Sequence, residues 1–151
     1  PPPVEEVTYI THTDSTYGFS VMYPDKWVAG AAAVPGVIWR VGGNGAYYIP
    51  PLRVIVRPSS QGATLQDVFA YHLTQDGNKT IKSITASSVN VHGYDYTKAA
   101  VAYASTAYTY DSKIMGRIVG GNWIIFEVYS VTYEFDTETQ QDDILNSVTF
   151  P

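Results

Sequence analysis

The chain has 151 residues, of which 45% are hydrophobic and 14% aromatic, and this size and composition fit one domain with a sizeable core. Its net charge of -5 and the scatter of its 9 Lys and Arg residues argue against a nucleic-acid partner, because phosphate binding needs clustered basic side chains. The absence of cysteine excludes disulfides, thiolate catalysis and cysteine-bound zinc.

A stiff, proline-rich lead precedes the first folded element. The residues Pro1 to Pro3 favour a polyproline conformation, so we predict a stalk or linker over residues 1–12 and a single α+β domain over residues 13–151. A removed signal or lipoprotein peptide explains such a start, and so does a cloning choice. We predict no transmembrane span, because the longest apolar candidate, Trp27–Trp39, is too short and contains Gly and Pro.

The first half of the chain contains three predicted strands. In the segment Tyr17–Pro24, the apolar residues Phe19, Val21 and Tyr23 alternate with Ser20 and Met22, which is typical of a strand with one buried face. The segments Val37–Val41 and Leu52–Arg57 follow, with glycine-rich and proline-rich punctuation between them.

Two capping boxes predict two helices. The first, Thr64–Asp67, precedes residues at helical spacing up to Leu73, and His72 on this helix is interpreted as a solvent-facing or core-edge residue. The second, Thr137–Gln140, precedes a short helix that contains Ile144 and Leu145.

Four β-rich runs lie between these helices. They are separated by Gly93, by the polar pair Asp111-Ser112 and by Gly120-Gly121, and these short connections predict an antiparallel meander. The runs are Ser83–His92, Tyr94–Tyr110, Lys113–Val119 and Asn122–Thr132. The predicted fold class is therefore α+β, with an antiparallel sheet of about six to seven strands flanked by two helices in an α-β-α sandwich.

No motif with a catalytic mechanism is present. Ser20 lies in the nearest match to a nucleophile elbow, but Met22 occupies the position where the sharp turn needs glycine. The histidines His12, His72 and His92 are far apart in sequence and match no metal-binding spacing. We therefore predict no catalytic residues and a protein that is not an enzyme.

One acidic segment is a candidate metal site. It offers hard oxygen ligands that suit calcium or manganese, but acids at a helix start also stabilise the helix dipole, and the spacing does not match an EF-hand loop. We predict a helix cap and no cofactor, with calcium as the open alternative. The residues are Glu134, Asp136, Glu138, Asp142 and Asp143.

Tyrosines near loops are candidates for an interaction surface. Tyr47 and Tyr48 lie in a predicted loop, and Tyr108 and Tyr110 lie near a predicted hairpin tip. Tyrosine buries a large area at low entropic cost, which favours recognition. Cross-strand packing on the sheet is the alternative use of the same side chains.

The segment Tyr17–Trp27, with the sequence YGFSVMYPDKW, resembles the opening motif of the PsbP-like family, in which a Gly-Phe strand runs into a Tyr-Pro turn and a Trp. The passages Val91–Tyr94, Gly116–Val119, Trp123–Phe126 and Ser147–Phe150 continue the resemblance, which extends from about Thr13 onward. It is made of packing and turn residues, so it is informative about the fold rather than about function.

This resemblance implies an extracytoplasmic protein, in a lumen or periplasm and often on a lipid anchor, that acts as an accessory or assembly factor. Family members with known roles serve photosystem II, and the family motif supplies no catalytic residues. We expect a non-enzymatic, lipoprotein-like binding domain, anchored upstream of residue 1, that contacts a protein or cell-envelope component through an aromatic-rich surface. The alternative is a carrier of a small ligand or divalent metal that uses the acidic segment or a pocket between sheet and helix. A hydrolase assembled from distant residues is the weaker alternative.

Overall fold

The structure is a computed structural model that describes residues 7–30, 34–42, 51–130 and 137–151, with side chains in the last range from Gln140 onward. In these ranges the strands are β1 (Tyr9–Thr13), β2 (Ser20–Pro24), β3 (Val28–Gly30), β4 (Val37–Gly42), β5 (Leu52–Pro58), β6 (Thr80–Val91), β7 (Tyr94–Ala104), β8 (Thr109–Val119) and β9 (Asn122–Tyr129). The helices are the 3₁₀ turn η1 (Ser59–Gln61) and the α-helices α1 (Leu65–Gln75) and α2 (Thr137–Asn146).

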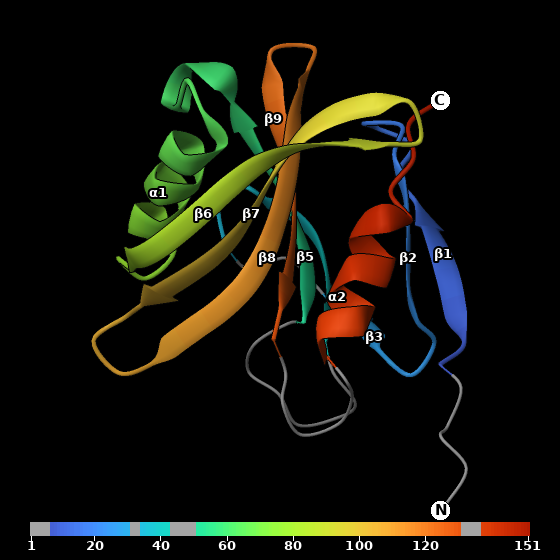
Figure 1. Cartoon of the computed structure of the whole chain (residues 1–151), viewed down its shortest axis with the longest axis horizontal. Coiled ribbons are helices and arrows are strands. Elements are labelled where there is room, and N and C mark those ends of the chain that lie inside the picture. Colours follow the sequence, from blue (N-terminus) through green and yellow to red (C-terminus); the bar gives the residue numbers. More distant parts are fainter. Residues whose placement is uncertain (1–6, 31–33, 43–50, 131–136) are drawn as a thin grey trace, which may run out of the picture.

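The central element is a seven-stranded antiparallel sheet with the order β3-β4-β5-β9-β8-β7-β6, and β1 and β2 form a separate two-stranded sheet. Figure 1 shows α1 and α2 on opposite sides of the large sheet. This is the predicted α+β fold, with the predicted number of strands in its main sheet.

The two hairpins β6–β7 and β8–β9 follow from the turn chemistry. The turn between β6 and β7 places Gly93 at a φ of 88°, and the turn between β8 and β9 places Gly120 and Gly121 at 57° and 81°. Residues with positive φ match the right-handed twist of paired strands, which favours glycine at such positions. The breaks predicted at these glycines are confirmed.

The predicted break at Asp111-Ser112 is wrong, because both residues lie inside β8. The chain turns earlier, between Ser105 and Tyr108, without glycine or proline. The Ser105 Oγ atom accepts backbone hydrogen bonds from Ala107 and Tyr108, so a side chain closes this turn.

The β1–β2 hairpin contains the strand predicted from the alternation around Val21. Phe19 and Val21 are fully buried, and Trp27 lies in the same core cluster. β1 begins at Tyr9, so residues 9–12 of the predicted lead pair with β2. The backbones of Ser20 and Thr149 exchange two hydrogen bonds of 2.9 Å, which attaches this hairpin to the C-terminal segment.

Helix α1 begins as predicted. The Thr64 side chain accepts a hydrogen bond from the Asp67 backbone N–H, which satisfies one of the free donors at the helix start. Its buried face packs on one side of the sheet and includes Phe69 and His72. His72 is therefore a core residue, not the solvent-facing or core-edge residue that was predicted.

Helix α2 packs on the other side of the sheet, over β9 and β2. Ile144 and Leu145 are fully buried there, together with Phe126 of β9. Among the described residues, neither α-helix has the length and apolar character needed to cross a membrane.

Candidate functional site

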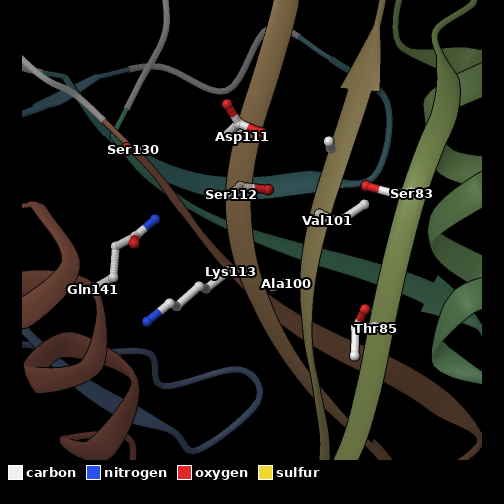
Figure 2. Close-up of a pocket in the computed structure, with 10 residues that line it drawn as sticks. Ser83, Thr85, Ala100, Val101, Asp111, Ser112, Lys113, Ser130 and Gln141 are labelled. Atoms are coloured by element: carbon white, nitrogen blue, oxygen red, sulfur yellow. The ribbon is translucent and has the colours of Figure 1, made fainter.

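An open groove of about 390 Å³ lies on the α2 side of the sheet, over β6, β7 and β8 (Figure 2). Two rows of aligned residues form its base. Thr85 of β6 is paired with Ala100 of β7, and Ala100 with Lys113 of β8. The second row, in the same order, is Ser83, Ala102 and Asp111. Since the central residue of each row is alanine, the middle strand leaves a hollow between its neighbours.

Helix α2 forms the wall of this groove. The Gln141 side-chain amide donates to the Val128 carbonyl at 2.8 Å, which fixes the helix against β9. Asp142 on the same helix accepts hydrogen bonds from the ammonium groups of Lys98 and Lys113 at 3.1 and 3.0 Å. Burial opposes the charge of Asp142, but these two lysines lower its pKa. The wall of the groove is thus attached to the sheet by contacts from β7, β8 and β9 to one helix.

The groove offers hydrogen bonds and charge. Thr85 and Ser83 present hydroxyl groups, Asp111 a carboxylate and Lys113 an ammonium group. The Ser112 hydroxyl is directed to the other side of the sheet, where it donates to Glu127 at 2.9 Å. None of the described lining residues is a histidine, so the serines of the groove lack the imidazole base that commonly activates a nucleophile. This set of groups suits binding.

A buried network of charged and polar side chains lies on the α1 side of the same strands. The Glu127 carboxylate accepts from Arg53 Nε at 2.6 Å and lies 2.6 Å from the Tyr103 hydroxyl. The Tyr103 hydroxyl also lies 2.6 Å from that of Tyr129. Because a phenol has one proton, Tyr103 donates to the carboxylate and accepts from Tyr129. Burial, together with the negative charge of Glu127, raises the pKa of both tyrosines.

Arg53 connects this network to the end of α1. Its Nη1 atom donates to Asp76 at 2.8 Å, and Lys79 donates to the same Asp76 oxygen at 2.9 Å. Desolvation opposes the charge of Arg53, but attraction to Glu127 and Asp76 raises its pKa. Every member is buried or half-buried, so the network holds strands and helix together rather than meeting a ligand.

The three histidines lie in three different places. His72 Nδ1 accepts from Arg57 at 3.0 to 3.2 Å, and burial lowers the His72 pKa to about 3. His12 stacks on Trp39 with ring centroids 3.9 Å apart, and burial lowers its pKa. His92 Nε2 lies 2.9 Å from the Asn146 carbonyl oxygen. Within the described residues, no group of three His, Asp or Glu side chains is arranged to hold a metal ion.

The predicted acidic segment is described only in part. Glu134 and Asp136 lie outside the described residues, and so does the Glu138 side chain. Asp142 is directed to the lysines of β7 and β8, whereas Asp143 accepts from the Tyr9 hydroxyl of β1 at 3.2 Å. The two described carboxylates therefore contact different parts of the sheets.

The predicted aromatic surface is also divided. Tyr47 and Tyr48 lie outside the described residues. Tyr108 is 68% exposed in the turn between β7 and β8. Tyr110 stacks on Tyr103 with ring centroids 5.0 Å apart and lies beneath the Lys79 ammonium group. Tyr108 is thus available for contact, and Tyr110 packs against the core.

Sequence reasoning did not single out the groove residues or the buried network. Arg53 and Glu127 each lie between apolar residues of a strand, and a charge at such a position is a signal that a partner lies nearby. The groove has no comparable signal, because it depends on the alignment of small residues in three separate strands.

Comparisons of the sequence with known protein families and with curated proteins found no match. Solved structures do match. The chain is similar to the solution structure of cyanobacterial PsbP (CyanoP) from Synechocystis sp. PCC 6803, with 18% identity, a TM-score of 0.69, and coverage of 98% of this chain and 95% of that one. It is also similar to a crystal structure from Bacteroides thetaiotaomicron, with 12% identity and a TM-score of 0.53 over 93% of this chain, and it spans 48% of that protein. At these identities the likeness concerns the fold, and the chain has a PsbP-like fold.

Proposed function

We propose that this chain is a non-enzymatic binding domain that works outside the cytoplasm and contacts a protein or a cell-envelope component. The observation that carries the proposal is the open groove over β6, β7 and β8, which is built on three paired strands and lined by hydroxyl, carboxylate and ammonium groups. Such a surface recognises a partner through hydrogen bonds and charge.

Tyr108 extends this surface at one end. It follows the turn that begins at Ser105, and the pair Ala104 and Thr109 at the base of the turn is two residues beyond the pair Ala102 and Asp111 in the groove. An exposed tyrosine beside a polar groove suits an interface, because the ring adds contact area at low entropic cost. The aromatic part of the interface is therefore proposed for Tyr108.

The extracytoplasmic location rests on the PsbP-like fold and on the motif Tyr17–Trp27. We include a lipid anchor in the proposal because the family resemblance implies one. The precursor sequence tests this point: a signal peptide with a lipobox supports the anchor, and a chain that begins in the cytoplasm without any leader contradicts the location.

Site-specific photo-crosslinking in the source organism tests the binding role. A photoreactive phenylalanine analogue at Thr85 or Tyr108 should give a discrete adduct. The control position is Asp67, which is exposed at the start of α1 on the opposite side of the sheet and outside β6. Adducts at Thr85 and Tyr108 but not at Asp67 are expected. Equal labelling at all three positions, or none, contradicts the proposal.

A carrier of a small ligand is the second candidate, and the size of the groove favours it. A space of about 390 Å³ lies in the range of small-molecule sites. A ligand at a hundred times its Kd should stabilise the fold by about 2.7 kcal/mol. A thermal-shift screen with calcium, sugars and lipids tests this, with Ala102→Trp as the variant that fills the groove. A shift in the wild type that disappears in this variant supports a carrier.

A further inference from the structure

Strand β6 forms one edge of the seven-stranded sheet. Its inner side is paired with β7 from Thr80, opposite Ala104, to Val91, opposite Tyr94. The sheet order ends at β6, and in the described parts of the chain no other strand pairs with its outer side. Figure 1 shows this strand running along the outside of the sheet. The alternate N–H and C=O groups on that side are available to another strand.

Only the beginning of this edge has the features that usually prevent strand addition. A register irregularity lies between Ile81 and Ser83, and Lys82 is the single charged residue of the strand. The remaining segment, Ile84–Val91, contains no charged residue, no proline and no glycine. Natural edge strands are normally protected by charges, prolines or bulges, because an unprotected edge pairs with other chains. Eight consecutive residues without such protection indicate a site that is kept open.

The charge of the edge distinguishes between two occupants. The chain carries a net charge of -5, whereas β6 contains one lysine, Lys82, and no acidic residue. The charges nearest to it on β7 are already engaged, because Lys98 is paired with Asp142 and Asp95 accepts a hydrogen bond from Asn90. A second copy of the chain would bring an identical edge, which has no carboxylate to place near Lys82. An extended segment of another polypeptide with an acidic residue at this position complements the edge.

The side chains of β6 indicate what this segment contains. Ser83 and Thr85 line the groove, and Ser87 lies two residues further along the same strand, on the same side. Hydroxyl side chains pair well with threonine or serine across strands. Ile84 and Ala86 face the α1 side, where aliphatic partners fit. We propose that the outer edge of β6 binds an extended segment of a partner protein as an additional strand, in which hydroxyl and aliphatic residues alternate and one acidic residue lies near Lys82. This inference rests on the proposed binding function and names its mode.

A synthetic peptide provides the test. The probe is an acetylated and amidated ten-residue peptide of alternating threonine and valine with one aspartate, and the control peptide has proline at alternate positions. Hydrogen exchange of the full chain with the probe should slow alternate amides within Ile84–Val91. The proline peptide should leave these amides unchanged, because it lacks the donors for strand pairing.

Two neighbouring substitutions test the edge itself. Consecutive N–H groups of a strand point alternately toward β7 and toward the free edge. Of Ser87→Pro and Ser88→Pro, one therefore removes a donor at the free edge and is called the outward variant, and the other breaks a hydrogen bond to β7. The outward variant should keep the wild-type Tm and weaken probe binding by about tenfold or more. Lys82→Glu should weaken binding of the peptide that contains aspartate about two- to fivefold, and it should strengthen binding of a peptide with lysine at that position by a similar factor.

Four results overturn the inference, and the last of them also distinguishes it from the proposed function. The first is probe binding that is unchanged in both proline variants, and the second is hydrogen exchange in Ile84–Val91 that the probe does not alter. The third is self-association of the chain, measured by sedimentation equilibrium, if the outward proline variant abolishes it. The edge would then bind a second copy of the chain rather than a partner protein. Crosslinks at Thr85 that persist in the outward proline variant refute strand addition and leave the proposed binding function standing. If the chain with the photoreactive residue but without a proline substitution gives no crosslinks, the binding function itself is refuted.

Discussion

Removal of the Glu127 carboxylate should destabilise the protein more than any surface change. The side chain is 0% exposed and accepts hydrogen bonds from Arg53, Tyr103 and Ser112. In Glu127→Ala the Arg53 guanidinium loses one of its two carboxylate partners and keeps Asp76. Its Nη2 atom already has no hydrogen-bond partner among the described residues. Breaking a buried ion pair from one side costs about 3–5 kcal/mol. For a domain of this size, that corresponds to a fall in Tm of roughly 6–20 °C.

Urea unfolding monitored by tryptophan fluorescence, together with thermal circular dichroism, measures this loss. The double variant Arg53→Met with Glu127→Leu should be less destabilised than the sum of its single variants by about 1–3 kcal/mol, since it leaves no unpaired charge between the two residues. Lys98→Met is the matched control, because its ion pair with Asp142 is partly exposed, at 22% and 41%, and should cost less than about 1 kcal/mol. A cost below about 1.5 kcal/mol for Glu127→Ala, or strict additivity in the double variant, refutes the reasoning.

Three further changes test other parts of the fold. Burial lowers the His72 pKa to about 3, so between pH 6.5 and pH 3 the unfolded chain binds a proton that the folded protein excludes. The contribution of neutral His72 to the free energy of unfolding is therefore present above about pH 6.5 and is lost as the pH falls toward 3. In His72→Asn, whose amide oxygen accepts from Arg57, urea midpoints at pH 7 and pH 5 should differ less than in the wild type, and an unchanged difference would contradict this. Gly62→Ala should cost more than about 2 kcal/mol, because its Cβ meets the backbone nitrogen of Val68, and a wild-type urea midpoint would refute the clash. Thr64→Ala should cost about 1 kcal/mol through loss of the α1 cap, measured by thermal unfolding, and a stability change near zero would show that the cap is dispensable.

Local patterns predicted the elements whose residues act through their immediate neighbours. The alternation around Val21 and the capping residue Thr64 depend on side chains within a few positions, so the sequence contained the needed information. The turn after Ser105 was missed because a serine hydroxyl, rather than glycine or proline, closes it. The buried position of His72 was readable in principle, since it lies three and four residues after Phe69 and Val68 on the same helix face.

Long-range pairing explains the rest of what sequence reasoning missed. Arg53 and Glu127 are directly opposite in the β5–β9 register, although 74 residues separate them. Their contact depends on strand order, which alternation along one strand does not reveal. The groove likewise exists because Ala100 and Ala102 are aligned with polar residues of two other strands. A register shift of one residue would place these alanines on the other side of the sheet.

The pairing of Ser20 with Thr149 has a consequence for how the chain matures. The hairpin that contains the segment Tyr17–Trp27 receives its last backbone partner from residues more than a hundred positions later. On a ribosome or in a secretion channel, which deliver the chain from its N-terminus, this hairpin lacks its C-terminal partner until the large sheet has emerged. Contacts of such long range slow folding, so we expect the first strands made to be among the last to become protected.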